Sequence, residues 1–101
     1  MIYKVKARFL EGKASEFYGK LTDGTISSQK PDGQEIVASM KRAKISEQGT
    51  IEWYETCYCP TPLKHERETV YDQYFTDLTT ENAKDYRVVE GKPFWDFLKD
   101  S

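Results

Sequence analysis

Two stretches of alternating apolar and polar residues constrain the fold of this chain most strongly. Residues 2–10 carry apolar side chains at every second position and basic side chains between them, namely Tyr3, Val5, Ala7 and Phe9 against Lys4, Lys6 and Arg8. Residues 51–59 repeat the alternation, with a more apolar side made of Ile51, Trp53, Glu55, Cys57 and Cys59. Because strand side chains point alternately to two faces, both stretches predict strands with one buried face.

Glu55 is the unusual member of the second stretch, because it lies on the apolar side between Trp53 and the thiols of Cys57 and Cys59. A carboxyl group in a core must be hydrogen-bonded, paired, or held neutral by a raised pKa. It could act as a general acid or base, or be a structural group bonded to an Arg, a Lys or a Tyr hydroxyl. The structural interpretation is favoured, since no nucleophile–base pair stands out beside it.

The remaining elements follow from periodicity and turn-forming residues. Apolar positions three and four apart predict helices over 14–21 and 33–44, the second starting at a capping-box pair of Asp32 and Glu35. Residues 69–79 fit a helical face or a strand, and their β-branched and aromatic content favours the strand. Toward the C-terminus we expect a helix over 80–85, a strand over 86–90, a break over 91–93 and a helix over 94–99.

The order strand, helix, strand, strand, helix, strand is the βαββαβ pattern of ferredoxin-like domains. We therefore expect one globular domain over residues 1–101, an α+β sandwich with helices on one face of a single antiparallel sheet. Aromatic residues make up 14% of the chain, so its small core should be rich in rings.

Charge and composition narrow the classes of function. The net charge of −2 argues against a general polyanion binder. The basic residues of the first strand would share a sheet face with Tyr54 and Tyr58, an arrangement used to bind single-stranded RNA, but no RNP-type motif is present. The sequence predicts no signal peptide and no membrane span, and two cysteines one residue apart are a poor disulfide framework. We therefore expect a cytoplasmic protein with reduced thiols that binds neither membranes nor nucleic acid.

The segment 53–75 carries a compact motif. It reads W-x-E-T-C-x-C-P-T-P-L-x-x-E-R over residues 53–67 and is followed by Tyr74 and Phe75. This run resembles a family of small bacterial proteins of unknown function, with weaker likeness in the first strand and around Met40. The resemblance implies that the segment is one structural unit, and it implies no activity.

The two thiols allow a second interpretation. Cys57 and Cys59, with His65 and Glu66 nearby in sequence, could bind a metal ion, although structural zinc usually takes four nitrogen or sulfur ligands. A redox role would need a neighbouring cation to lower a thiol pKa, and Glu55 and aromatic rings are closer in sequence. Buried, inert cysteines and a solvated loop histidine at position 65 are the favoured interpretation, with no cofactor.

The sequence thus favours a non-catalytic binding or protein-interaction module, with a thiol-redox or metal-binding protein centred on Cys57 and Cys59 as the alternative. The contact surface would be residues 60–68, the loop over 22–34, or the tyrosine-bearing sheet face. The ligand would be a protein partner, which could be a second copy of the chain, or a small molecule. The candidate binding residues are Trp53, Tyr54, Glu55, Cys57, Tyr58, Cys59, His65 and Arg67.

Overall fold

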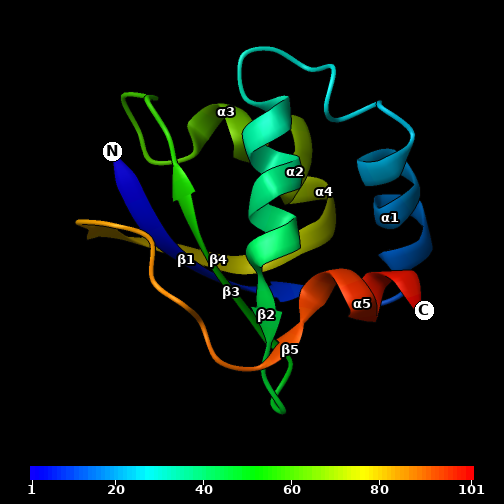
Figure 1. Ribbon diagram of the computed structural model, residues 1–101. Coiled ribbons are helices and arrows are strands. Elements are labelled where there is room, and N and C mark those ends of the chain that lie inside the picture. Colours follow the sequence, from blue (N-terminus) through cyan, green and yellow to red (C-terminus); the bar gives the residue numbers. More distant parts are fainter.

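Five strands form one antiparallel sheet in the computed structural model of residues 1–101, in the order β4-β1-β3-β2-β5 (Figure 1). β1 pairs with β3 on one side and with β4 on the other, while the short strands β2 and β5 extend the sheet beyond β3. The strands are β1 (Ile2–Phe9), β2 (Lys44–Ile45), β3 (Thr50–Thr56), β4 (Phe75–Ala83) and β5 (Lys92–Pro93). The expected α+β class with a single antiparallel sheet is confirmed.

The helices lie together on one side of this sheet in Figure 1. They are α1 (Ala14–Thr22), α2 (Gly33–Arg42) and α5 (Phe94–Lys99), plus a helical stretch between β3 and β4 made of α3 (Lys64–Glu66), the π-helical turn η1 (Arg67–Tyr71) and α4 (Asp72–Tyr74). The helices expected over 14–21, 33–44 and 94–99 are therefore present, the second ending two residues early. No helix has the length and apolar character needed to cross a membrane.

The alternation in β1 produces the two faces that it predicts. Tyr3, Val5 and Ala7 are buried against the helices. On the other face, Lys4 and Lys6 place their Nζ atoms 3.3 and 3.6 Å from the same Glu52 carboxylate oxygen. These two basic residues are therefore paired with a neighbouring strand.

Aromatic rings fill much of the core, as the composition predicts. Phe17 and Tyr74 stack with ring centroids 4.3 Å apart, and Trp53 lies 5.2 Å from Phe75 and 5.3 Å from Tyr71. Such pairs add to the free energy gained by burying their large apolar areas. The packing also fixes Trp53 and Tyr71 beside the carboxyl group of Glu55.

The strand expected over residues 69–79 is wrong for its first half, because the chain is helical through Tyr74 and β4 begins at Phe75. Val70, Tyr71 and Tyr74 are buried at spacings that place them on one helical stripe. The strand propensity of a residue depends on how its side chain packs on a sheet. In this segment the side chains pack in the core from a helix instead, so their strand propensity does not decide the structure.

Three expectations nearer the C-terminus are also wrong. The helix over 80–85 is absent because β4 stays paired with the central strand β1 as far as Ala83. Residues 86–90 form no strand, and the expected break at 91–93 instead contains β5, where Pro93 pairs with Lys44 of β2. A proline is tolerated there because β5 is an edge strand.

The start of α2 makes a close backbone contact that a mutation can test. A Cβ on Gly33 would overlap the Ile26 carbonyl group and lie 3.1 Å from the Ser27 carbonyl oxygen. We expect Gly33→Ala to lower the free energy of unfolding by about 1–3 kcal/mol, the usual cost of overpacking. The matched variant is Gly19→Ala, inside α1, where the new Cβ meets nothing within 4 Å. We expect it to raise the free energy of unfolding by up to about 1 kcal/mol, because alanine favours the helix over glycine. Urea unfolding measures both, and a Gly33→Ala variant as stable as wild type would contradict this contact.

Candidate functional site

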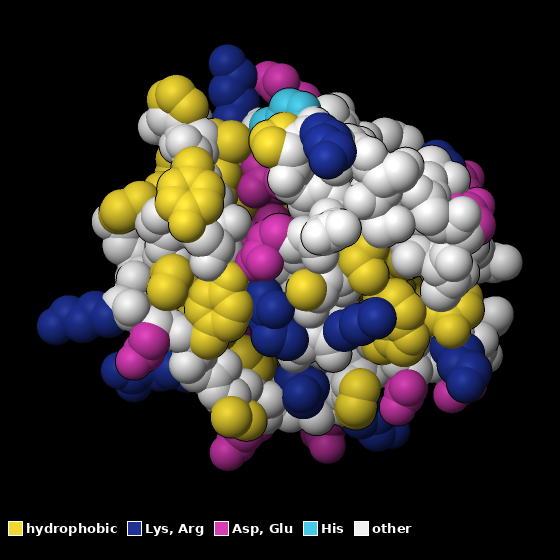
Figure 2. All heavy atoms as spheres, turned by 45° about the horizontal axis from the view of Figure 1, so that its top comes forward, with side chains coloured by type: hydrophobic (Ala, Val, Ile, Leu, Met, Phe, Trp, Pro, Cys, Tyr) yellow, Lys and Arg dark blue, Asp and Glu magenta, His cyan; other side chains and the backbone are white.

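A cleft of about 500 Å³ opens where the start of α2, the end of β3 and the short helix α3 meet. We call it the thiol cleft, and its lining residues are Pro31, Asp32, Glu35, Thr56, Cys57, Tyr58, Cys59 and Glu66. Figure 2 shows acidic side chains along a groove below the single histidine. Three carboxyl groups and two thiols line the cleft, with no Lys or Arg among its lining residues.

Both thiols of the cleft meet one buried carboxyl group. The Cys57 Sγ lies 3.6 Å, and the Cys59 Sγ 3.4 Å, from Oε1 of Glu66, whose side chain is buried. The expected continuation of the strand through Cys59 is wrong, because β3 ends at Thr56. The chain turns after β3, and the Cys59 backbone N–H donates to the Cys57 Sγ at 3.2 Å. This turn, rather than strand alternation, brings both thiols to Glu66.

The two cysteines are free and differ in their environment. Cys57 is buried, and that burial raises the pKa of its thiol to about 12. Cys59 is half-buried at the edge of the cleft. The thiolate is the reactive form of cysteine, so Cys57 lacks the lowered pKa of a redox or nucleophilic thiol.

This difference predicts that alkylation of the native protein separates the two thiols. Iodoacetamide at neutral pH should label Cys59 first, whereas Cys57 should react only on the time scale of local opening, because it is buried and neutral. Peptide mass spectrometry over a time course measures the two rates, and labelling in denaturant provides the control. Equal native rates at both positions would contradict the burial of Cys57.

His65 is held by Asp32 at the rim of the cleft. Its Nδ1 lies 2.6 Å from Oδ2 of Asp32, which also accepts a hydrogen bond at Oδ1 from Gln29 Nε2. The Asp32 carboxylate raises the pKa of His65 through this hydrogen bond and through its charge. The loop position expected from sequence is therefore wrong, because His65 lies on α3, whereas its side chain is partly exposed, as expected. The capping-box expectation is wrong too, since Asp32 makes no side-chain cap to α2.

Glu66 connects these two groups of side chains. Cys57, Cys59 and Glu66 place ligand-type atoms within 4.8 Å of one another, and so do Asp32, His65 and Glu66. Sequence proximity suggested Cys57, Cys59, His65 and Glu66 together, but it did not indicate Asp32, which lies 33 positions before His65. Only the fold places the loop before α2 against α3.

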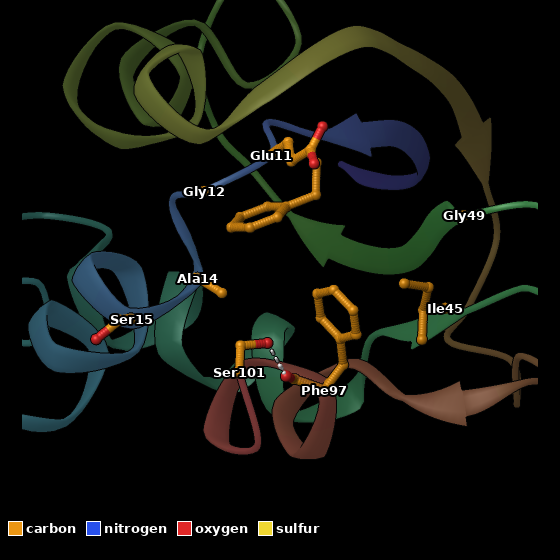
Figure 3. A pocket seen from close by; sticks show the side chains of 9 residues that line it. Glu11, Gly12, Ala14, Ser15, Ile45, Gly49, Phe97 and Ser101 are labelled. Atoms are coloured by element: carbon orange, nitrogen blue, oxygen red, sulfur yellow. Dashed lines mark hydrogen bonds between the residues drawn. The ribbon is translucent and has the colours of Figure 1, made fainter.

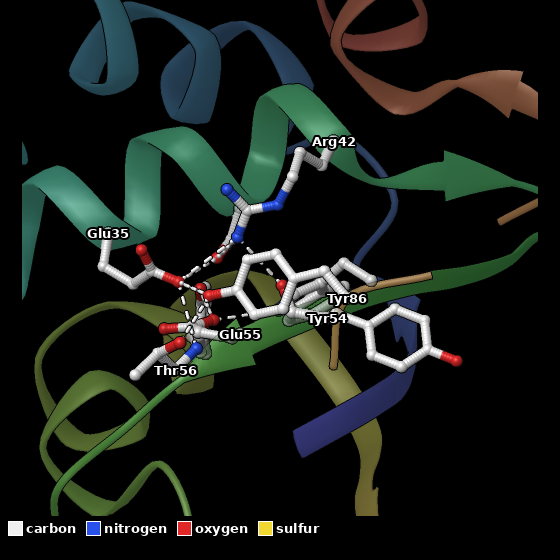
Figure 4. A network of polar contacts seen from close by, with 9 residues as sticks. Glu35, Arg42, Tyr54, Glu55, Thr56 and Tyr86 are labelled. Carbon is white, nitrogen blue, oxygen red and sulfur yellow. Dashed lines mark hydrogen bonds and ion pairs between the residues drawn. The ribbon is translucent and has the colours of Figure 1, made fainter. Parts of the chain in front are cut away.

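A polar network closes one end of the cleft and is shown in Figure 4. Glu35 Oε2 accepts hydrogen bonds from the Thr56 backbone N–H at 3.0 Å, from Arg42 Nη2 at 3.2 Å and from the Tyr86 hydroxyl at 2.7 Å. The Arg42 guanidinium also lies over the Tyr86 ring, 4.4 Å from its centroid. This network ties α2 to the end of β3 and to the segment after β4. Sequence reasoning missed Arg42 and Tyr86 as site-supporting residues, because no local pattern links them.

Glu55 lies in the core and does not line the cleft. Its Oε1 accepts hydrogen bonds from Trp53 Nε1 at 2.9 Å and from the Tyr71 hydroxyl at 2.5 Å, while its buried Oε2 has no partner. Burial raises the pKa of Glu55 to about 8 against the lowering effect of these two hydrogen bonds, and the charges of Glu66 and Glu35 add to the rise. The expectation of a core carboxyl group bonded to a tyrosine hydroxyl is confirmed.

The other candidate residues lie apart from the cleft or only at its edge. Tyr54 is buried, and its carbonyl accepts a hydrogen bond from Arg42. Tyr58 lies beyond the end of β3 with 88% of its surface exposed, so the expected sheet face carrying both tyrosines is wrong. Trp53 is fully buried, and Arg67 forms an exposed pair with Asp72 at 3.5 Å.

A second pocket of about 460 Å³ lies at the other end of the sheet and is shown in Figure 3. Phe9, Ile45 and Phe97 provide much of its apolar lining. The polar side chains that line this pocket do not converge on one point. The Ser101 hydroxyl donates a hydrogen bond to the Phe97 carbonyl oxygen at 2.6 Å. Binding sites combine an apolar wall with convergent polar groups, so the thiol cleft is the better candidate.

Comparison with protein families, with curated proteins and with solved structures finds no match to this chain.

Proposed function

We propose that this protein is a non-catalytic binding module and that its thiol cleft binds a small cation. The observation that carries this proposal is the convergence of two thiols on the buried Glu66 carboxyl group, in a cleft that Asp32 and Glu35 also line. Glu35 is paired with Arg42 and Asp32 with His65, so Glu66 is the lining carboxyl group that has no basic partner. Thiol and carboxyl groups that meet in this way are ligands for cations. The cleft also unites the residues around 60–68 with the end of the 22–34 loop, two of the surfaces that the sequence suggested.

A binding role is favoured over thiol catalysis by the state of the side chains. Burial raises the pKa of the Cys57 thiol, which disfavours the nucleophilic thiolate. The imidazole of His65 is engaged with Asp32. The buried carboxyl of Glu55 does not line the cleft, so it has no substrate-facing position for acid–base work.

The ferredoxin-like form of the fold is part of the same proposal. The antiparallel order β4-β1-β3-β2 and the helical segments after β1 and after β3 support it. β5 and α5 would then be additions at the edge next to β2. In this arrangement the cleft lies at the end of β3 from which the chain enters α3.

Amide chemical-shift mapping of the reduced full chain tests the proposal. The probes are Zn²⁺, Ca²⁺, a short alkyl diamine and guanidinium, with inorganic phosphate as the anionic control. We expect at least one cation to shift the amides of Asp32, Cys57, Cys59 and Glu66 in a saturable way, while phosphate leaves them unchanged. Asp32→Asn should weaken the response, whereas the matched variant Asp72→Asn should not, because Asp72 lies outside the cleft on an exposed pair.

Two outcomes would overturn the proposal. The first is a set of cleft amides that no cation moves at concentrations that saturate ordinary binding sites. The second is a response to phosphate that exceeds the response to every cation. Unmoved cleft amides combined with a dimer in analytical ultracentrifugation would instead favour the protein-interaction form of the module.

A further inference from the structure

We propose that the cation of the thiol cleft is a thiophilic divalent metal ion of the zinc class, ligated by Cys57, Cys59, Glu66 and His65, with Asp32 as a positioning residue. This inference rests on the proposed function and narrows its ligand from a small cation to one class of metal. It is carried by the distances among the donor atoms and by the chemistry of the donor set.

The sulfur-to-oxygen distances suit a tetrahedral ion. Zinc binds sulfur at about 2.3 Å and carboxylate oxygen at about 2.0–2.2 Å, so a tetrahedral site places these two atoms about 3.5 Å apart. The Cys57 and Cys59 sulfurs lie 3.6 and 3.4 Å from Glu66 Oε1. Both sulfur-to-oxygen distances therefore match those that one ion would impose, and the two sulfurs lie within 4.8 Å of each other.

The contact between His65 and Asp32 suits a fourth ligand. Zinc-binding histidines typically donate one ring N–H to a carboxylate, which fixes the tautomer and leaves the other nitrogen to the metal. Here Nδ1 of His65 lies 2.6 Å from Asp32, so Nε2 is the nitrogen left for an ion. His65 belongs to a second group of ligand-type atoms, with Asp32 and Glu66, whose atoms lie within 4.8 Å of one another and which does not include the thiols. Glu66 is common to both groups, so the His65 ring would have to move toward the thiols to complete the ligand set.

The donor types select among cations. Two thiols and an imidazole favour zinc and related soft ions, whereas Ca²⁺ and Mg²⁺ prefer sites made of oxygen alone. On binding, each cysteine releases its proton to solvent, and the divalent charge offsets the two thiolates and the Glu66 carboxylate. No oxidation or reduction is involved.

Cobalt absorption on the anaerobically reduced full chain tests this site. We expect one equivalent of Co²⁺ to give thiolate-to-cobalt charge-transfer absorption with the intense visible bands of tetrahedral Co²⁺, and one equivalent of Zn²⁺ to abolish both. Cys57→Ser/Cys59→Ser should lose the charge-transfer absorption. Cys59→Ser alone serves if loss of the buried Cys57 prevents folding, and it should weaken that absorption.

Competition with a chromophoric chelator gives the zinc affinities of the remaining variants. Asp32→Asn should weaken zinc binding about 10–100-fold, as loss of a histidine-orienting carboxylate does, while keeping the tetrahedral cobalt spectrum. His65→Ala should weaken binding and change the visible bands, because it removes a ligand. Asp72→Asn should change neither quantity.

The outcomes separate this inference from the proposed function. Co²⁺ that binds without charge-transfer absorption would overturn ligation by the thiols. Failure of both Co²⁺ and Zn²⁺ to bind, while an organic cation shifts the cleft amides, would overturn the metal inference and leave the proposed function standing. No response to any cation would overturn both.

Discussion

Raising the pH from about 5 to about 8.5 should lower the free energy of unfolding of the metal-free wild type by on the order of 4 kcal/mol more than that of Glu55→Gln. The pKa of Glu55 is about 8 in the folded chain against 4.5 for the ordinary side chain. The folded state therefore holds a proton that the unfolded state has lost. The stability contributed by this group is complete below pH 4.5 and is lost as the pH rises through 8.

Glutamine is a close substitute for the protonated form of Glu55. Its carbonyl oxygen can accept the hydrogen bonds from Trp53 and Tyr71, and its amide group takes the position of the unpartnered Oε2. The variant cannot ionise, so its stability should not follow this titration. The difference between the two proteins therefore measures the titration of Glu55 together with its coupling to the charges of Glu66 and Glu35.

Urea unfolding at several pH values, in buffer with a chelator, measures this difference. Glu55→Gln should be the more stable protein at pH 8.5 and about equal to wild type at pH 5. Parallel pH profiles for the two proteins would show that Glu55 titrates alike in the folded and unfolded states. That result would contradict the buried environment of its carboxyl group.

A zinc ion at about 100 times its dissociation constant should raise the midpoint of thermal unfolding by about 10–20 °C. Binding to the native state alone contributes about 2.7 kcal/mol at that concentration, and each kcal/mol shifts the midpoint of a domain of this size by about 4–8 °C. The proposed ligands lie on the turn after β3 and on α3, so melting either segment would break the ligand set.

Thermal scans with Zn²⁺, with Ca²⁺ and with chelator test this expectation. Ca²⁺ should shift the midpoint little, because it binds thiols poorly. Cys57→Ser/Cys59→Ser should lose the zinc-dependent shift, whereas Asp72→Asn should keep it. An equal shift with both metals would point to the carboxylates alone and contradict a role for sulfur.

The strands and helices that the sequence predicts best are those with long, regular patterns. β1 alternates over most of its length, and its apolar residues reach the core as expected. The prediction fails over residues 69–83. The helix that carries Tyr71 and Tyr74 changes to a strand at Phe75, within one run of aromatic residues, so local propensity cannot locate the change. The edge strand β5 exists only through its pairing with β2.

Part of the candidate site could be predicted from the sequence, because several of its residues are close along the chain. Cys57, Cys59, His65 and Glu66 are neighbours along the chain, and the expected burial of Glu55 follows from alternation. The sequence indicated Asp32 and Glu35 only as the start of a helix. In the structure, Asp32 binds His65, and Glu35 accepts a hydrogen bond from the Thr56 backbone N–H. Tyr86 reaches Glu35 from 51 positions away, so only the tertiary structure joins them.

The most direct measurement is a crystal structure of the reduced chain grown with Cd²⁺, using anomalous scattering to locate the metal. Cadmium prefers thiolate ligands as zinc does and scatters strongly. We expect one strong peak in the thiol cleft, within bonding distance of Cys57, Cys59 and Glu66. An empty cleft, with cadmium bound only to surface carboxylates elsewhere, would contradict it.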